Sequence, residues 1–258
     1  MDKKQNKKKL NKLSAIFLLA GFGKRISDIT NKPKCLLKIN KKTLIDRNLN
    51  ILKKIGIRNV VFVLGYKKQM IKKQIKKFDK SFNFKFAFNN DYRSRGNSFS
   101  LLKGLEKSQG DPLVFDGDLI FSFRILKNFL KDNENSSFLI GKTPISNIEC
   151  AKALADEHGF IRKTIDKRLI KKSELKKYKF VGEAIGIVQI KDNIRAKMIS
   201  RLKKFLKIKK NLKLNWEHFM NEFLRDNYFD YKKTSNSQWI EIDTKHDYIK
   251  AKSLFKND

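Results

Sequence analysis

The sequence predicts an α/β protein with a doubly wound, mostly parallel sheet and helices on both of its faces. Short apolar runs at residues 15–19, 59–64 and 113–115 have the length of buried strands. Segments with apolar residues at helical spacing separate these runs, and strands that alternate with helices form parallel sheets. At 258 residues and 40% hydrophobic content, one such domain with a sizeable core is the natural expectation. We therefore expect a basic tail at residues 1–13 and a single domain at residues 14–258.

Each element of the first half follows from its own pattern. Apolar residues recur at helical spacing over residues 44–55, and Gly56 is placed to end that helix in a left-handed conformation. Four phenylalanines alternate along residues 82–88, which is strand spacing. This stripe is either a stacking surface for bases or, as we favour, a strand face packed on helices. Ser98 is placed to cap the next helix.

The second half is less regular, but its apolar patterns still predict elements. Strands are expected at residues 137–140, 151–156, 160–165, 183–190 and 239–242, and helices at residues 122–131, 192–207, 216–224 and 245–255.

The net charge of the chain is +34, from 60 Lys and Arg against 26 Asp and Glu. Such a charge suggests nucleic acid or an anionic membrane surface as a binding partner. The lysines are spread over almost every predicted helix, together with abundant Asn, Ile and Phe, as A/T-rich codons would produce. The sequence contains no zinc finger, RNP-type aromatic motif or clear helix-turn-helix. We predict no specific nucleic-acid partner, and only non-specific binding at low salt.

Cysteine and hydropathy patterns indicate a cytoplasmic protein. Two cysteines cannot form a disulfide framework, and three scattered histidines make no metal-ligand pattern. The apolar stretch at residues 15–20 runs into a Gly-rich turn and lacks a signal-peptide cleavage site. No apolar run is long enough to span a bilayer.

A Gly-rich turn followed by a basic loop is the most informative feature of the chain. Residues 18–25 read Leu-Leu-Ala-Gly-Phe-Gly-Lys-Arg, and residues 30–37 read Thr-Asn-Lys-Pro-Lys-Cys-Leu-Leu. Small residues at the end of a buried strand let backbone N–H groups approach a triphosphate. Arg25 and Lys34 bring positive charge to the same anion. The combination predicts a protein that handles nucleotides.

These residues resemble the nucleotidyltransferase superfamily, whose signature reads Leu-Ala-Ala-Gly-x-Gly-x-Arg followed by Pro-Lys-x-Leu. Leu19 departs from it, since the family usually has Ala there. Segments at residues 92–101, 114–121 and 239–243 extend the resemblance over all but the basic tail. Among subgroups, the chain is most similar to compact cytidylyltransferases that act on phosphocholine or aminoethylphosphonate.

The resemblance implies a Rossmann-like fold, Mg²⁺ as cofactor, and transfer of a CMP group from CTP to a small phosphorylated or phosphonate acceptor with release of pyrophosphate. The alternatives are a sugar-1-phosphate nucleotidyltransferase that uses UTP, dTTP or GTP, and a non-catalytic, basic nucleic-acid-binding protein.

The predicted site lies beyond the carboxyl ends of the strands, where open parallel sheets bind ligands. The Gly-rich turn, Gly65 and residues 116–118 each follow a predicted strand and should meet at one rim. In the related enzymes the Gly-rich turn and an Asn-x-x-Ser-Leu-like segment flank the base. The residues expected to contact the nucleotide are Leu19, Ala20, Gly21, Gly23, Gly65, Asn97, Ser98 and Asp116.

Asp118 is the first metal candidate, because Mg²⁺ prefers oxygen ligands and a strand-terminal carboxylate can supply one. The resemblance implies Asp243 as its partner. By the same resemblance, Arg25 holds the β- and γ-phosphates and Lys34 neutralises charge near the α-phosphate. These two residues are the predicted catalytic pair.

Two residues are candidates for the second substrate. Glu183 begins an apolar strand, where it is either a contact for an ammonium group or a strand-end charge. Trp216, with Tyr178 and Phe180, is either a cation–π wall or a member of the apolar stripe of its helix.

Overall fold

The structure is a computed structural model that describes residues 9–131, 133–235 and 238–256. The strands are β1 (Leu13–Leu19), β2 (Lys38–Ile39), β3 (Lys42–Thr43), β4 (Asn59–Leu64), β5 (Asn83–Phe88), β6 (Asp111–Asp116), β7 (Leu119–Phe121), β8 (Ser136–Gly141), β9 (Ala151–Ala155), β10 (Ile161–Asp166), β11 (Lys179–Gln189), β12 (Phe229–Lys233) and β13 (Trp239–Glu241). The α-helices are α2 (Leu44–Ile55), α3 (Lys68–Ile75), α4 (Asn97–Lys107), α5 (Phe123–Phe129), α6 (Lys172–Leu175), α7 (Asp192–Lys207), α8 (Trp216–Phe223) and α9 (Lys245–Leu254).

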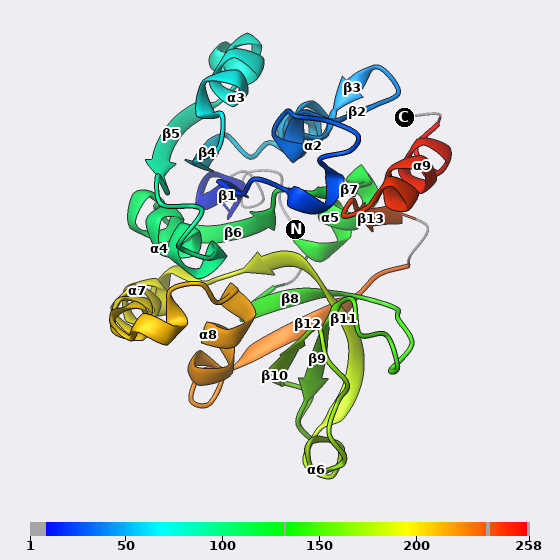
Figure 1. Cartoon of the computed structure of the whole chain (residues 1–258). Helices are drawn as coiled ribbons and strands as arrows, with labels where there is room; N and C mark the ends of the chain where they lie inside the picture. The colour runs from blue at the N-terminus through cyan, green and yellow to red at the C-terminus, as the bar shows by residue number, and fades with distance from the viewer. Residues whose placement is uncertain (1–8, 132, 236–237, 257–258) are drawn as a thin grey trace.

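A nine-stranded mixed sheet runs through the molecule in the order β10-β9-β11-β6-β1-β4-β5, and β8 pairs with both β11 and β12. Strands β6, β1, β4 and β5 are parallel neighbours, whereas β11 joins β6 in antiparallel orientation. In Figure 1 the parallel strands lie in the upper part with α2 to α5, and β8 to β12 lie below them. The predicted doubly wound α/β class is therefore confirmed.

Strand β1 lies at the centre of this sheet, and all seven of its residues are buried. Phe17 stacks between Phe62 of β4 and Phe115 of β6, with ring centroids 5.8 and 4.9 Å away, on the face covered by α2 and α5. Ile16 points to the opposite face, where it joins the core made with α4, α7 and α8. Burial on both faces explains why the sequence of this strand is a continuous apolar run.

Helix α2 has the bounds that the sequence predicts. The side chain of Thr43 accepts a hydrogen bond from the backbone N–H of Asp46 and so caps the start of the helix. Gly56 ends the helix with φ of 103°, a left-handed conformation that a glycine adopts without strain.

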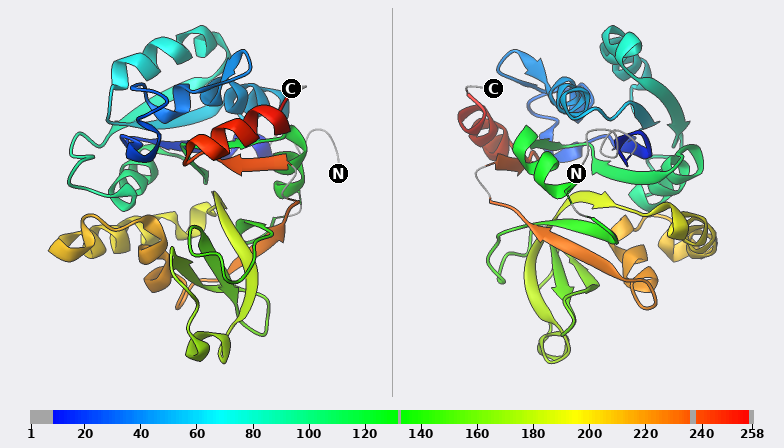
Figure 2. Two further views of the ribbon diagram at one scale, coloured as in Figure 1. Left: turned by 45° about the vertical axis from the view of Figure 1, so that its right-hand side comes forward. Right: turned by 180° about the vertical axis from the view of Figure 1, so that it is seen from behind.

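The C-terminal segment returns to the first half of the chain. Strand β13 pairs with the short strand β7 in antiparallel register, and the backbone N–H of Ile242 donates to the carbonyl of Asp118 at 3.1 Å. Figure 2 shows β13 and α9 beside the N-terminal strands and helices in both views. This return brings Asp243 to the edge of the sheet that carries Asp118.

One local expectation is wrong and another holds. Ser98 is wrong as a helix cap, because Gly96 occupies the cap position and Ser98 lies one residue inside α4, fully buried. The phenylalanine stripe is mostly core, as favoured: Phe82 is buried, Phe84 and Phe86 pack on the cluster around Phe62, and Phe88 at the end of the edge strand is exposed.

The predicted division of the chain places a basic tail at residues 1–13 and a single domain after it. Strand β1 begins at Leu13, one residue before the predicted boundary, while residues 1–8 lie outside the described residues. Both halves of the chain contribute strands to the nine-stranded sheet. The single domain at residues 14–258 stays a prediction.

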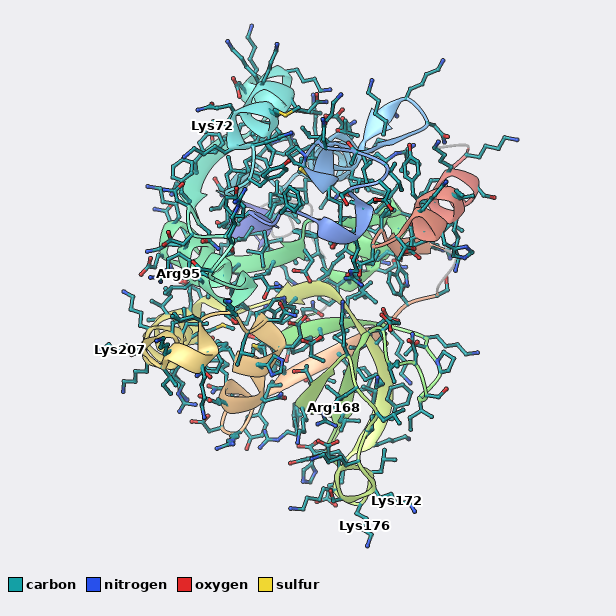
Figure 3. All side chains as sticks on the ribbon, in the orientation of Figure 1. Lys72, Arg95, Arg168, Lys172, Lys176 and Lys207 are labelled. Carbon is teal, nitrogen blue, oxygen red and sulfur yellow. The ribbon has the colours of Figure 1, made fainter. Side chains whose placement is uncertain are left out.

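The excess positive charge lies on the surface and is spread over the fold. Figure 3 labels basic side chains on elements far apart in the fold, among them Lys72 on α3, Lys172 on α6 and Lys207 on α7. Among the described helices, none combines the length and the apolar character that a bilayer-spanning segment requires.

Candidate active site

Three loops meet at the carboxyl ends of β1, β4 and β6. The backbone N–H of Tyr66 donates to the carbonyl of Ala20 at 3.1 Å, which ties the loop after β4 to the Gly-rich turn. A Cβ added to Gly65 would lie 2.7 Å from that same carbonyl oxygen, and one added to Gly117 would lie 2.6 Å from the carbonyl oxygen of Leu18. Glycine is required at both positions, because the backbones of the loops lie too close together to leave room for a Cβ atom.

A cavity of about 380 Å³ opens at this rim, between the parallel strands and the sheet region of β9 to β11. Its lining residues are Leu18, Gly21, Gly23, Arg25, Lys34, Asn97, Asp116, Gly117, Asp118, Leu119, Glu149, Cys150, Ala151, Asp166, Lys167, Ala184, Ile185, Gly186, Asn215, Glu217, Glu241 and Asp243.

The Gly-rich turn forms one side of the cavity. A Cβ on Gly21 would meet no atom within 4 Å, so the space in front of this residue is open to a ligand. Gly23 has φ of 69°, which favours glycine on conformational grounds. Arg25 follows in a 3₁₀ turn (Lys24–Ile26) and its side chain is about half exposed at the cavity mouth.

Lys34 joins two carboxylates from distant parts of the chain. Its Nζ donates to Asp118 Oδ2 at 3.0 Å and to Asp243 Oδ1 at 2.7 Å. Arg25 donates to the other oxygen of Asp243. Although burial opposes the charge of Lys34, the two carboxylates outweigh burial and raise its pKa. The predicted catalytic pair and the predicted metal pair therefore form one network.

Two carboxylates of this network and the neighbouring Glu241 are close enough to bind one cation. Single oxygens of Asp118, Glu241 and Asp243 lie within 4.8 Å of one another. Asp118 Oδ1 is buried and has no hydrogen-bond partner among the described residues. Burial, Asp118 and Asp243 raise the pKa of Glu241 well above its usual range. Oxygen donors with an unmatched negative charge suit a hard divalent cation such as Mg²⁺, so the residues fit the predicted cofactor.

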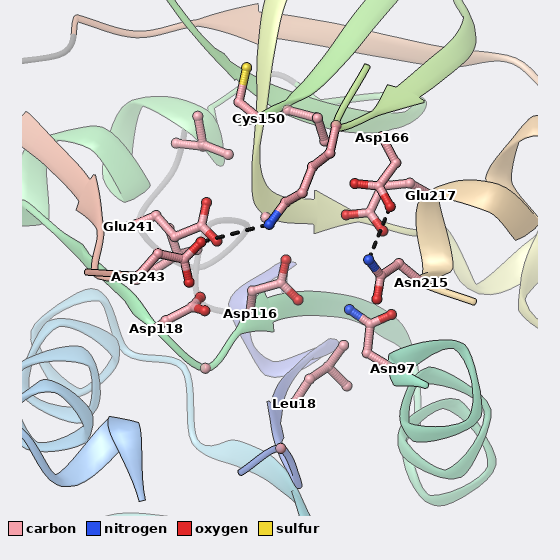
Figure 4. A pocket seen from close by; sticks show the side chains of 18 of the residues that line it. Leu18, Asn97, Asp116, Asp118, Cys150, Asp166, Asn215, Glu217, Glu241 and Asp243 are labelled. Atoms are coloured by element: carbon pink, nitrogen blue, oxygen red, sulfur yellow. Dashed lines mark hydrogen bonds and ion pairs between the residues drawn. The ribbon is translucent and has the colours of Figure 1, made fainter. Parts of the chain in front are cut away.

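Asp116 lies between this trio and a second acidic group. Burial, Glu217 and Asp118 raise its pKa well above the usual range. A Cβ on Gly186 would lie 2.5 Å from Asp116 Oδ2, and Gly186 has φ of 70°. Figure 4 shows Asp118, Glu241 and Asp243 at one side of the cavity and Asp166 and Glu217 at the other.

The second acidic group is supported by α8 and the end of β10. Asn215 Nδ2 donates to Asp166 Oδ2 at 3.0 Å, and His218 Nε2 lies 3.3 Å from the same oxygen. Burial and the neighbouring Asp166 raise the pKa of Glu217 to about 8. Asn97 Oδ1 accepts from the backbone N–H of Trp216 at 2.7 Å and fixes the start of α8.

Not all predicted site residues reach the main cavity. Leu19 lines a smaller hollow beside the Gly-rich turn, and Glu183 lines another that shares Arg25, Glu241 and Asp243 with the main cavity. The predicted residues outside the lining of the main cavity are Leu19, Ala20, Gly65, Ser98, Glu183 and Trp216.

Trp216 is a core residue here, which corrects its expected place at a substrate wall. Its side chain is 2% exposed and stacks on Phe138 with centroids 6.2 Å apart. Tyr178 and Phe180 do not line the cavity either. Of the two interpretations of Trp216 from the sequence, membership of the apolar stripe of α8 is the correct one.

Sequence reasoning missed five charged residues of the cavity: Glu149, Asp166, Lys167, Glu217 and Glu241. Glu241 stands two residues before Asp243, and the Glu-x-Asp spacing was a signal for it. Asp166 and Lys167 follow a predicted strand without any motif. Glu217 is a charged residue beside the apolar stripe of α8, which was a signal that the helix borders a site.

Comparison with known proteins relates this geometry to a group of enzymes. The choline-phosphate cytidylyltransferase of Streptococcus pneumoniae is 23% identical over 248 residues, which span 95% of this chain and 100% of that protein. The solved CTP:phosphocholine cytidylyltransferase from Streptococcus pneumoniae has a TM-score of 0.73 at 21% identity, with 94% of this chain and 98% of that chain covered.

A UDP-glucose pyrophosphorylase complexed with UDP-glucose has the same TM-score of 0.73 at 15% identity, with 94% of this chain and 98% of that chain covered. These structural likenesses show the shared fold. Residues 15–139, which carry the Gly-rich turn, Lys34 and Asp118, match the MobA-like NTP transferase domain. The resemblance of this chain to the nucleotidyltransferase superfamily, predicted from its motifs, is therefore confirmed.

Proposed function

We propose that the protein transfers a CMP group from CTP to a small phosphorylated or phosphonate acceptor, with release of pyrophosphate and with Mg²⁺ as cofactor. The observation that supports this most is the contact of Lys34 with both Asp118 and Asp243 beside the Gly-rich turn. Positive groups for phosphates and carboxylates for a metal lie within one hydrogen-bonded network.

In this proposal the residues of the chain act by alignment and by charge stabilisation. The backbone of the turn at Gly21 and Gly23 receives the triphosphate, and Arg25 binds the β- and γ-phosphates. Lys34 neutralises the charge that develops at the α-phosphate. Asp118, Glu241 and Asp243 would hold Mg²⁺, which supplies positive charge to the phosphates of both substrates.

The acceptor needs no general base. Its phosphate or phosphonate oxygen is ionised at neutral pH and attacks the α-phosphorus, while the bond to the β-phosphate oxygen breaks and pyrophosphate leaves. Lys167 Nζ lies 3.8 Å from Asp243 Oδ2 inside the cavity. It is therefore placed to bind the acceptor phosphate next to the reacting centre.

A pyrophosphate-release screen tests the proposal. Each of CTP, UTP, dTTP and GTP is combined with phosphocholine, 2-aminoethylphosphonate, phosphoethanolamine and common sugar 1-phosphates, with and without Mg²⁺. We expect turnover with CTP and an amino-alkyl acceptor, and its loss in Lys34→Ala but not in Lys41→Ala, a control at an exposed lysine. Turnover with a sugar 1-phosphate and another nucleotide would support the sugar-nucleotide alternative instead.

A further inference from the structure

The cavity is acidic although the protein is strongly basic. Seven of the 26 acidic residues line it, against three basic residues, in a chain of net charge +34. Within the trio of Asp118, Glu241 and Asp243, Asp118 pairs with Lys34, and Asp243 pairs with Lys34, Arg25 and Lys167. The remaining acidic side chains have to be explained by something other than the metal trio.

Glu217 is one of them. Its side chain lines the cavity and is 9% exposed, and its Oε2 has no hydrogen-bond partner among the described residues. Within the described part of the chain, no lysine or arginine forms an ion pair with Glu217 or with Asp166. A buried carboxylate without a partner destabilises a protein, so its place at a cavity wall points to a ligand.

Burial and the adjacent Asp166 raise the pKa of Glu217 to about 8. The nearby carboxylates therefore repel a second negative charge, and a positive group between them would relieve this repulsion. The three-ligand group of the described residues, the trio, lies at the other end of the cavity. A monovalent organic cation fits a pair of carboxylates.

Asp166 and Lys167 give the cavity wall two opposite charges in adjacent positions. Lys167 has a positive φ of 43° and reaches toward Asp243, whereas Asp166 is held by Asn215 at the opposite end. Figure 4 shows this separation of Asp166 from Asp243. An acceptor that carries a phosphate at one end and an ammonium group at the other would meet complementary charges along this wall.

We propose that Glu217 and Asp166 form the subsite for the ammonium group of the acceptor, and so select a zwitterionic amino-alkyl phosphate or phosphonate over a sugar phosphate, which has no positive group. This inference rests on the proposed function, and it replaces Glu183 and Trp216 as the contacts for the cation. Neither Glu217 nor Asp166 is a catalytic residue in this proposal, since both lie at the end of the cavity opposite Asp118 and Asp243.

Isosteres of the acceptors in which carbon replaces the ammonium nitrogen test the subsite. Phosphocholine is compared with 3,3-dimethylbutyl phosphate, and 2-aminoethylphosphonate with propylphosphonate, in kcat/KM and in binding in the presence of a nonreactive CTP analogue. For one of these pairs we expect the wild type to prefer the compound with the ammonium group by about tenfold or more, as one well-placed ion pair allows. Glu217→Gln should narrow this preference to within about threefold without raising the KM for CTP. Glu222→Gln, at an exposed position of the same helix, should not change it.

Three results decide the inference. If Glu217→Gln and Asp166→Asn both keep the wild-type preference for the ammonium compound over its isostere, the inference is overturned. It is also overturned if Glu217→Gln changes the ratio of kcat/KM for CTP to that for UTP but leaves the acceptor preference unchanged, since Glu217 would then contact the base. Asp166→Asn serves as the independent variant if Glu217→Gln does not fold. If no nucleotide and acceptor give pyrophosphate, the proposed function is wrong. The subsite is then judged by direct binding of phosphocholine and 2-aminoethylphosphonate: binding to the wild type that weakens in both variants supports it, and any other result overturns it.

Discussion

Lys34 Nζ lies 2.7 Å from Asp243 Oδ1, although 209 positions of sequence separate the two residues. The contact exists because β13 pairs with β7, which directly follows the loop of Asp118. The C-terminal segment thus completes a site that the first 120 residues begin. In this structure the ammonium group of Lys34 lies among the carboxylates that we assign to the metal.

Metal binding should therefore compete with Lys34 in the absence of nucleotide. We expect Lys34→Met to bind Mg²⁺ or Mn²⁺ more tightly than the wild type by about tenfold, because a positive charge leaves the carboxylates. The same variant should lose pyrophosphate release. Calorimetry without nucleotide measures the affinity, with Lys41→Met as a matched control. Equal or weaker metal binding by Lys34→Met would show that the ammonium group does not compete for this position.

The buried carboxyl of Glu217 should make stability fall as pH rises. Its folded-state pKa of about 8 lies above its usual value of 4.5, so the folded state holds a proton that the unfolded state has lost between these values. Between these pH values, the free energy of unfolding of the wild type should fall by up to about 1.4 kcal/mol per pH unit relative to that of Glu217→Gln. Urea unfolding at pH 5.5 and pH 8 measures the difference. Glu222→Gln should show no such pH dependence relative to the wild type. If the free energies of unfolding of the wild type and Glu217→Gln differ by the same amount at both pH values, the carboxyl of Glu217 is not buried as described.

Much of the fold is predictable because its elements carry local signals. Helix α2 shows this best, since its apolar spacing and Gly56 fix both its face and its end. The short strands β7 and β12 were missed, because they form only by pairing with β13 and β8 and carry little signal of their own.

The candidate site is predictable only where a motif exists. Lys34, Asp118 and Asp243 were found from motifs, and the structure brings their side chains together. Asp166 and Glu217 face one another only after α8 packs on β10, which no local pattern reports. Ser98 was misassigned because a serine before an apolar run is typical of a cap, whereas the close approach of Gly96 to the carbonyl oxygens of Lys213 and Leu214 decides the actual start of α4.

Asn97 and Ser98 should respond differently to truncation. Asn97→Ala removes the acceptor of the Trp216 N–H bond at the start of α8 and should lower stability by about 0.5–2 kcal/mol. It should also raise the acceptor KM, because α8 carries Glu217. Ser98→Ala should be nearly neutral or stabilising, since the buried Ser98 Oγ has no partner among the described residues. Urea unfolding of both variants checks this, and a larger loss for Ser98→Ala would restore its role as a cap.

The most direct measurement for the proposed function is Mg²⁺-dependent pyrophosphate release by Asp118→Asn and Asp243→Asn. Each variant keeps the shape of the side chain and removes one negative charge from the trio, so we predict a loss of about a hundredfold or more in kcat with the fold retained. Asp79→Asn, at an exposed position, should keep wild-type activity. Near-normal Mg²⁺-dependent release by both Asp118→Asn and Asp243→Asn would contradict the assignment of this network as the reacting centre.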